Sequence, residues 1–204
     1  MMLNLHHIAY PIRSLGPGLR VGVWFAGCRR NCPGCMSPEL QPPESGRLVA
    51  VERLAGRLLD IDAPLAGVTI SGGEPLDQPA ALTELLSGLA CARPEWSVIL
   101  YTGYVMSEIE EDPERAHVLR MADALIAGPF DAASPQRHPL AGSGNQQVMA
   151  LTERGQKMLE ELPTSSFPLV DLGLGPRGAA MLIGVTQDAT RRDIVNALAE
   201  KSGA

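Results

Sequence analysis

Three cysteines dominate the chemistry that this sequence can support. Cys28, Cys32 and Cys35 lie within eight residues of one another, and no fourth cysteine is close to them. Thiolates bind soft metals, and three of them on one short loop can share a single iron–sulfur cube. A pure electron carrier closes every corner of its cube with protein. The spacing therefore predicts a four-iron cluster with one iron left open for a substrate or a cofactor.

The residues around the cysteines suit a loop that wraps a cluster. Gly27 and Gly34 let the backbone approach closely, and Pro33 stiffens the turn. The alternative is a zinc site, in which His6 or His7 completes a set with the three cysteines. Zinc motifs commonly pair two C-x2-C knuckles, whereas this run has a single pair, so the sequence favours iron.

Length and composition indicate one globular domain. The chain has 204 residues, of which 45% are hydrophobic and 20% are charged. No apolar run could span a bilayer and the N-terminus lacks signal-peptide features, so we expect a cytoplasmic protein without a membrane partner. That compartment also keeps clustered thiols reduced. The net charge of −6 argues against nucleic acid as a partner.

Apolar runs alternate with helical patterns along most of the chain. The sequence predicts buried strands at 19–26, 68–71, 97–101 and 123–127. It predicts helices at 49–61, at 78–92, within 107–121 and around Lys157. Cys91 is expected in the core, on the apolar face of the second helix. The alternation implies parallel crossovers, and therefore an α/β fold with a parallel sheet that is open or curled into a partial barrel.

Each predicted strand ends in a polar or glycine-rich string. After the first strand comes the cysteine loop, and the later strands end in GGEP at 72–75, TGY at 102–104 and GPF at 128–130. The carboxyl ends of parallel strands lie on one edge of a sheet, where active sites are built. The four strings are therefore expected to converge on one surface.

The cysteine loop, GGEP, YTGY at 101–104 and GSxNQ at 142–146 occur in the order typical of one superfamily. With these motifs the chain resembles the radical S-adenosylmethionine (SAM) superfamily, and within it the activating proteins of anaerobic ribonucleotide reductases. The resemblance covers roughly residues 5–150 and implies a partial (β/α) barrel of the radical SAM type.

The resemblance implies a cofactor and a reaction. Cys28, Cys32 and Cys35 would hold a [4Fe-4S] cluster whose open iron binds SAM, and no catalytic residue is expected beyond these ligands. One electron, from a donor of the flavodoxin or ferredoxin type, would cleave SAM to methionine and a 5′-deoxyadenosyl radical. In the activating proteins this radical takes a hydrogen atom from a glycine of a partner glycyl-radical enzyme.

The resemblance also implies which residues contact SAM. Backbone at Gly72 and Gly73 can bind the methionine ammonium group, and Glu74 can pair with it. Thr102 and Gly103 are expected near the ribose or the carboxylate. Polar contacts are further assigned to the GSxNQ string, namely to Ser143, Asn145 and Gln146.

One position departs from the superfamily pattern. The residue after the third cysteine is commonly aromatic and packs on the adenine, but here it is Met36. Methionine can still give apolar contact with a ring. The adenine contact is assigned to Met36, with Tyr104 as the alternative.

The tail of the chain lies beyond the resemblance. We divide the sequence into a radical SAM-like core at 1–162 and a C-terminal extension at 163–204 that packs on the same domain. Within the extension the sequence predicts a strand at 180–185 and a helix at about 189–200.

Two other functions compete with glycyl-radical activation. The first keeps the radical chemistry but acts on a peptide or a small molecule, as peptide maturases and 7-carboxy-7-deazaguanine synthases do. The second is a non-catalytic module that binds zinc or transfers electrons. Metal content, and the response of the cluster spectrum to SAM, separate this second class from the enzymes.

Overall fold

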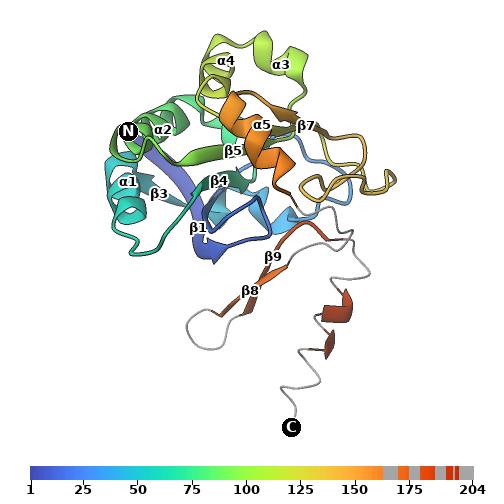
Figure 1. Cartoon of the computed structure of the whole chain (residues 1–204). Helices are drawn as coiled ribbons and strands as arrows, with labels where there is room; N and C mark the ends of the chain where they lie inside the picture. Colours follow the sequence, from blue (N-terminus) through green and yellow to red (C-terminus); the bar gives the residue numbers. More distant parts are fainter. Residues whose placement is uncertain (163–169, 175–179, 187–191, 195, 198–204) are drawn as a thin grey trace.

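A computed structural model describes residues 1–162, 170–174, 180–186, 192–194 and 196–197 of the chain (Figure 1). The described strands form a seven-stranded sheet, in the order β3-β1-β2-β4-β5-β6-β7, and a separate hairpin, β8-β9. The strands are β1 (Met2–Ile12), β2 (Arg20–Phe25), β3 (Arg47–Ala50), β4 (Gly67–Gly72), β5 (Ser97–Thr102), β6 (Ala124–Ala127), β7 (Gln147–Ala150), β8 (Asp171–Leu174) and β9 (Ala180–Ile183). The α-helices are α1 (Val51–Leu59), α2 (Pro79–Ala92), α3 (Met106–Glu110), α4 (Pro113–Leu119) and α5 (Glu153–Glu160).

The centre of the sheet is parallel and its two sides are antiparallel. Strands β2, β4, β5 and β6 pair in parallel, as the apolar runs predicted. Strand β1 pairs antiparallel with β2 and β3, and β7 pairs antiparallel with β6. The α/β class is confirmed, and the predicted parallel sheet is found to be a mixed sheet with parallel strands at its centre. The sheet is open over the described residues, because β3 and β7 are its two ends.

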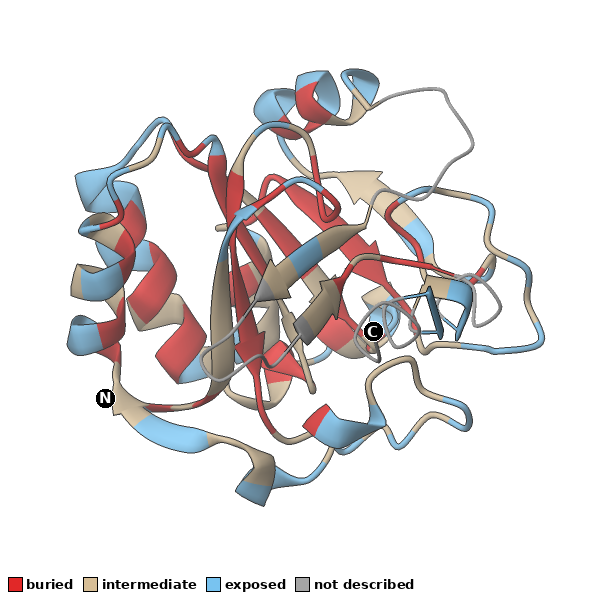
Figure 2. Cartoon of the chain, turned by 90° about the horizontal axis from the view of Figure 1, so that it is seen from below, coloured by how far each residue is buried: buried red, intermediate tan, exposed pale blue. Residues whose placement is uncertain are grey.

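The two faces of the sheet are covered differently. Helices α1 and α2 lie on one face (Figure 1), where the side chains of β2, β4 and β5 join their leucines in the largest apolar core. Figure 2 shows buried residues along the strands and on the inner sides of the helices. The opposite face is covered by α5 and by the hairpin β8-β9 (Figure 1). The hairpin is fastened to the core by Asp171 Oδ2, which accepts the backbone N–H groups of Arg13 and Ser14, both at 2.8 Å.

Several predicted elements differ in detail from the observed ones. The first helix starts at Val51 rather than residue 49, because residues 47–50 pair with β1. The region 107–121 forms two helices, since Asp112 caps a new helix that begins at Pro113. Cys91 is exposed, which corrects its assignment to the core. It follows Leu89 by two positions and so points away from the face of α2 that Leu89 shares with Leu85.

The extension agrees with the sequence where the structure describes it. The strand predicted at 180–185 corresponds to β9. The helix predicted at about 189–200 falls largely outside the described residues.

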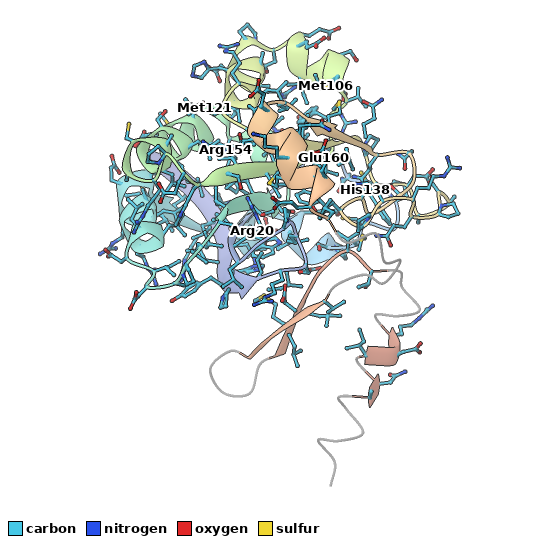
Figure 3. All side chains as sticks on the ribbon, in the orientation of Figure 1. Arg20, Met106, Met121, His138, Arg154 and Glu160 are labelled. Atoms are coloured by element: carbon cyan, nitrogen blue, oxygen red, sulfur yellow. The ribbon has the colours of Figure 1, made fainter. Side chains whose placement is uncertain are left out.

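A buried arginine joins the amino ends of the central strands. Arg20 is fully buried, and its guanidinium donates to Thr69 Oγ1 at 2.8 Å and to Ser97 Oγ at 2.9 Å. It also donates to the carbonyl oxygens of Val68 and Ser97, both at 2.8 Å. Figure 3 marks the position of Arg20 in the fold. Burial lowers the pKa of Arg20 to about 10, so the side chain stays charged at neutral pH. This network closes the end of the sheet opposite the strand-end loops.

Candidate functional site

The carboxyl ends of the central strands open into a cavity of about 240 Å³. Residues from the cysteine loop, from the ends of β4 and β5 and from strand β9 line it. Ten of the residues predicted to bind the cluster or SAM are among the lining residues, namely Cys28, Cys32, Cys35, Met36, Gly72, Gly73, Glu74, Thr102, Gly103 and Gln146. Segments far apart in the sequence therefore meet at one surface, as the parallel crossovers predicted.

Backbone hydrogen bonds hold the cysteine loop in place. Cys28 N donates to the carbonyl oxygen of Gln41 at 3.0 Å, and Cys35 N donates to that of Cys32 at 3.2 Å. Ser37 N donates to Cys35 Sγ at 3.4 Å, so one amide of the loop already points at a sulfur atom. Burial raises the pKa of the Cys28 thiol.

The two glycines after β4 allow the strand to meet the cysteine loop. Gly72 has φ of 119°, in a region that favours glycine. A Cβ atom on Gly73 would overlap the carbonyl oxygen of Gly27 and lie 2.8 Å from that of Leu40. This close approach lets Glu74 N donate to the Gly27 carbonyl oxygen at 2.8 Å.

Glu74 ties the ends of β4 and β5 together. Its carboxylate is fully buried, and Oε1 accepts from Leu76 N at 2.9 Å and from Thr102 Oγ1 at 2.8 Å. Oε2 accepts from Gly103 N at 2.7 Å. Burial raises the pKa of Glu74 to about 7, against the stabilising effect of these donors. The sequence assigned Glu74 to the SAM ammonium group, and the structure adds that it fixes the two strand ends.

A network of charged side chains around Tyr104 contacts the cysteine loop. Arg30 Nη1 lies 2.6 Å from Glu108 Oε1, and the Arg30 guanidinium carbon lies 4.9 Å from the centre of the Tyr104 ring. Arg115 stacks on the same ring at 3.8 Å. Tyr104 Oη donates to Asp77 Oδ1 at 2.7 Å, and Asp77 Oδ2 accepts from Arg29 N at 3.1 Å. Tyr104 is therefore held between two guanidinium groups and is not one of the described residues that line the cavity.

Met36 is accompanied by an aromatic residue from another loop. Met36 and Phe130 both line the cavity, and a Cβ atom on Gly142 would lie 2.9 Å from Met36 Sδ and 3.1 Å from Phe130 Cδ2. Phe130 lies three residues after the end of β6, so an aromatic ring missing from the cysteine loop is available nearby. The GPF string at 128–130 was recognised in the sequence as a strand-end motif, although Phe130 itself was not assigned a role.

The GSxNQ string contributes mainly to the shape of its loop. Ser143 is fully buried and accepts Asp131 N at 3.1 Å, while Asn145 Nδ2 donates to the Pro129 carbonyl oxygen at 2.8 Å. Gln146 lines the cavity, and its Oε1 accepts from Gly142 N at 2.7 Å. Within the described chain, Ser143 and Asn145 stand outside the cavity wall.

Part of the cavity wall was not found from the sequence. His7, Trp24 and Tyr101 line it, as do residues 181–185 of the hairpin segment. The His7 and Trp24 rings are stacked with their centres 4.3 Å apart. These residues come from β1, β2, β5 and β9, and no local pattern links strands so distant in sequence.

The thiol donors fit an iron–sulfur cluster. All three cysteines are free, partly buried and exposed to one cavity, and thiolates are the ligands that such clusters use. Within the described part of the chain, no set of three or more His, Cys, Asp or Glu side chains surrounds a position for a single metal ion. A four-iron cluster takes each thiolate on a different iron, so its ligands need not converge on one point.

The fold and this cavity define an α/β domain suited to an iron–sulfur cluster, and comparison with known proteins agrees. The model of the family described as 4Fe-4S single cluster domain matches residues 14–149, and the chain belongs to this family. No described helix is both long and apolar enough to cross a membrane.

Curated relatives indicate a more specific likeness than the family model does. The anaerobic ribonucleoside-triphosphate reductase-activating protein of Enterobacteria phage T4 is 29% identical over 68% of this chain and 88% of its own length. The protein of the same name from Vibrio cholerae is 29% identical over 72% of this chain and 98% of its own length. A 7-carboxy-7-deazaguanine synthase of Methanothermobacter thermautotrophicus is 42% identical, but over 35% of this chain and 31% of its own length. The resemblance predicted from the motifs is confirmed.

Proposed function

We propose that this protein is a radical SAM enzyme that activates a partner of the anaerobic ribonucleotide reductase type. It would cleave SAM reductively at a [4Fe-4S] cluster and take a hydrogen atom from a glycine of the partner. The observation that carries this proposal is the cavity shared by the three cysteines and the ends of β4 and β5. The relatives of that name, which match over nearly their whole length, support it.

The bound cofactors supply the chemistry. When bound, a cluster held by Cys28, Cys32 and Cys35 would supply the one-electron reduction of SAM, which would leave methionine, 5′-deoxyadenosine that carries the glycine hydrogen atom, and a glycyl radical on the partner. We assign the electron to a flavodoxin or ferredoxin type donor. The protein binds and orients the reactants and excludes solvent.

The described residues divide this task between them. Cys28, Cys32 and Cys35 hold the cluster, and the open backbone of Gly72 and Gly73 receives the methionine ammonium group. Thr102 and Gly103 approach the ribose or the carboxylate, and Met36 together with Phe130 flanks the adenine.

Other predicted residues act through their neighbours. Glu74 keeps the strand ends in register through its three hydrogen bonds and adds negative potential near the ammonium group. Ser143 and Asn145 shape the loop that carries Gly142 and Gln146, rather than contacting SAM themselves.

The finer architecture belongs to the same proposal. We assign residues 1–162 to a radical SAM-like core whose sheet curls into a partial barrel, and residues 163–204 to an extension packed on it. The convergence of β1, β2 and β5 on one cavity supports a curved sheet, and the contacts of Asp171 support the packing of the extension. Clustered free thiols favour the reducing cytoplasm as the compartment.

A second candidate keeps the chemistry and changes the substrate. The partial likeness to a 7-carboxy-7-deazaguanine synthase favours a radical SAM enzyme that acts on a small molecule. Formation of 5′-deoxyadenosine without a glycyl radical on any reductase would favour this candidate.

The proposal is tested by anaerobic reconstitution with iron, sulfide and a strong reductant, followed by assay for 5′-deoxyadenosine. An anaerobic ribonucleotide reductase is then added, and a glycyl radical is sought by electron paramagnetic resonance. We expect both products from the natural chain and neither from Cys32→Ala.

The matched control is Cys91→Ala, which removes the exposed cysteine outside the cavity. It should keep the iron content and both products. Equal product from the natural chain and Cys32→Ala would reject the radical mechanism, and zinc in place of iron would indicate a non-catalytic module.

A further inference from the structure

The cavity has a second wall, made of residues to which no contact with the cluster or SAM has been assigned. Trp24, Ile183 and Val185 belong to one apolar cluster, and Tyr101 and Met181 pack against it. All five residues line the cavity. The residues from β9 lie beyond residues 14–149, the part that the family model matches. This chain therefore adds a wall of its own to the site.

Two polar atoms of this wall have no hydrogen-bond partner among the described residues. They are His7 Nε2 and Tyr101 Oη, and both are buried. The other ring nitrogen of His7 is occupied, because its Nδ1 lies 2.6 Å from His6 Nδ1. Buried polar groups in native proteins are nearly always paired, so two orphans on one cavity indicate a ligand that pairs with them.

The charge of the wall limits the chemistry of that ligand. Among the described residues, the charged side chains on the cavity are those of Arg30, Glu39 and Glu74, which come from the cysteine loop, the turn after it and the end of β4. The lining residues of β2, β5 and β9 are uncharged. Burial, with a smaller effect of His6, lowers the pKa of His7 to about 4, so this side chain is neutral as well. Burying a charged ligand against this wall would be costly, whereas a neutral polar group is tolerated.

A backbone amide has the chemistry that this wall can satisfy. It offers one donor and one acceptor, and the two orphan atoms can supply one of each, because a phenol donates and a neutral imidazole nitrogen accepts. Because a glycine has no side chain, a binding site can recognise it only through the backbone amides on either side of it. The apolar side chains of β9 that now pack near Tyr101 would give way to the entering segment.

We propose that His7, Tyr101 and the apolar side chains of β9 form the site that receives the glycine-bearing segment of the protein substrate, by contacting a backbone amide beside the reactive glycine. This inference rests on the proposed function, and it selects a neutral peptide segment over a charged small molecule.

The test compares variants of the full, cluster-loaded chain. Tyr101→Phe removes the orphan hydroxyl, and Tyr10→Phe is the matched control because Tyr10 is exposed on β1 away from the cavity. We expect Tyr101→Phe to raise both the Kd for an anaerobic ribonucleotide reductase, measured by interferometry, and the KM for glycyl-radical formation. One lost hydrogen bond predicts about a tenfold rise, with a smaller change in kcat. Tyr10→Phe should change neither constant.

A second pair of variants tests the wall if Tyr101→Phe fails to fold. Met181→Glu places a charge on the wall, whereas Leu172→Glu places one on the exposed surface of the same hairpin. Met181→Glu should weaken reductase binding about tenfold or more, and Leu172→Glu should not.

The outcomes separate this inference from the proposed function. Equal Kd and KM for Tyr101→Phe and Tyr10→Phe, or for the two glutamate variants, would overturn the substrate site and leave the radical chemistry intact. A natural chain that makes 5′-deoxyadenosine only with a charged small molecule would overturn the peptide assignment. A natural chain that makes no 5′-deoxyadenosine would overturn the proposed function itself.

Discussion

Glu74 N donates to the carbonyl oxygen of Gly27 at 2.8 Å, and this bond joins the end of β4 to the start of the cysteine loop. The bond exists because Gly73 leaves room for the loop backbone. The GGE string therefore acts on the cluster site through its backbone as well as through any contact with SAM.

Gly73→Ala should disrupt the cluster site. The added Cβ would overlap the Gly27 carbonyl oxygen, which is backbone and cannot turn aside, so the cysteine loop has to move. We expect less iron bound per chain after anaerobic reconstitution. Gly56→Ala is the control, because a Cβ there meets no atom within 4 Å and should stabilise α1 by about 0.5–1 kcal/mol. Full iron content in Gly73→Ala would contradict the prediction.

Glu74 should make stability depend on pH. The pKa of Glu74 in the folded state is about 7, which lies above the ordinary value of 4.5. Its contribution to the free energy of unfolding is therefore fully present below about pH 4.5 and is lost as the pH rises through 7. Relative to Glu74→Gln, the natural chain should lose about 3 kcal/mol of unfolding free energy between pH 4.5 and pH 8. Urea unfolding of the iron-free chains at several pH values measures this difference. A difference that stays constant with pH would mean that the carboxylate does not change its protonation on folding.

His7 should make the folded protein less stable as the pH falls. Burial, and to a smaller extent His6, lowers its folded-state pKa from 6.5 to about 4. The contribution of His7 to the free energy of unfolding is therefore present above pH 6.5 and is lost as the pH falls towards 4. His7→Phe keeps a ring against Trp24, so the midpoint of its thermal unfolding should fall less than that of the natural chain between pH 6.5 and pH 4.5. Parallel curves for the two proteins would show that His7 does not titrate in this range.

Arg20 should be essential for stability. Arg20→Met removes every hydrogen bond of the guanidinium and leaves Thr69, Ser97 and two carbonyl oxygens short of donors in a buried place. Leaving several such groups unpaired should cost about 3 kcal/mol or more in urea unfolding. Arg47→Met, at an exposed position, should change the unfolding free energy by less than about 0.5 kcal/mol. Similar values for the two variants would contradict the structural role of Arg20.

The central strands were predictable because they are buried on both faces. Their apolar runs and the glycine-rich strings after them are local patterns, and the cysteine loop was found in the same way. Strand β1 was missed because its exposed and half-buried positions include two histidines and Pro11, which break the apolar pattern. Strands of this kind are fixed by the strands on either side of them rather than by their own sequence.

The candidate site was predictable where it follows a strand end. The wall made of His7, Tyr101 and Met181 was not, because its residues are up to 174 positions apart and meet only after the sheet and the hairpin have folded. The two orphan atoms likewise cannot be inferred from residue types, since the same side chains are paired in most proteins.

Strand β9 brings side chains into the cavity from outside the part of the chain that the cluster family shares. The cysteine loop and the strand ends are tied to one another by backbone hydrogen bonds, whereas the hairpin contacts the core through Asp171 and through the apolar packing of Ile183. Exchange of this hairpin between proteins would transfer a preference for one substrate without disturbing the machinery that generates the radical. Evolution can thus diversify such enzymes, and engineers can retarget them, through an appendage of a few dozen residues.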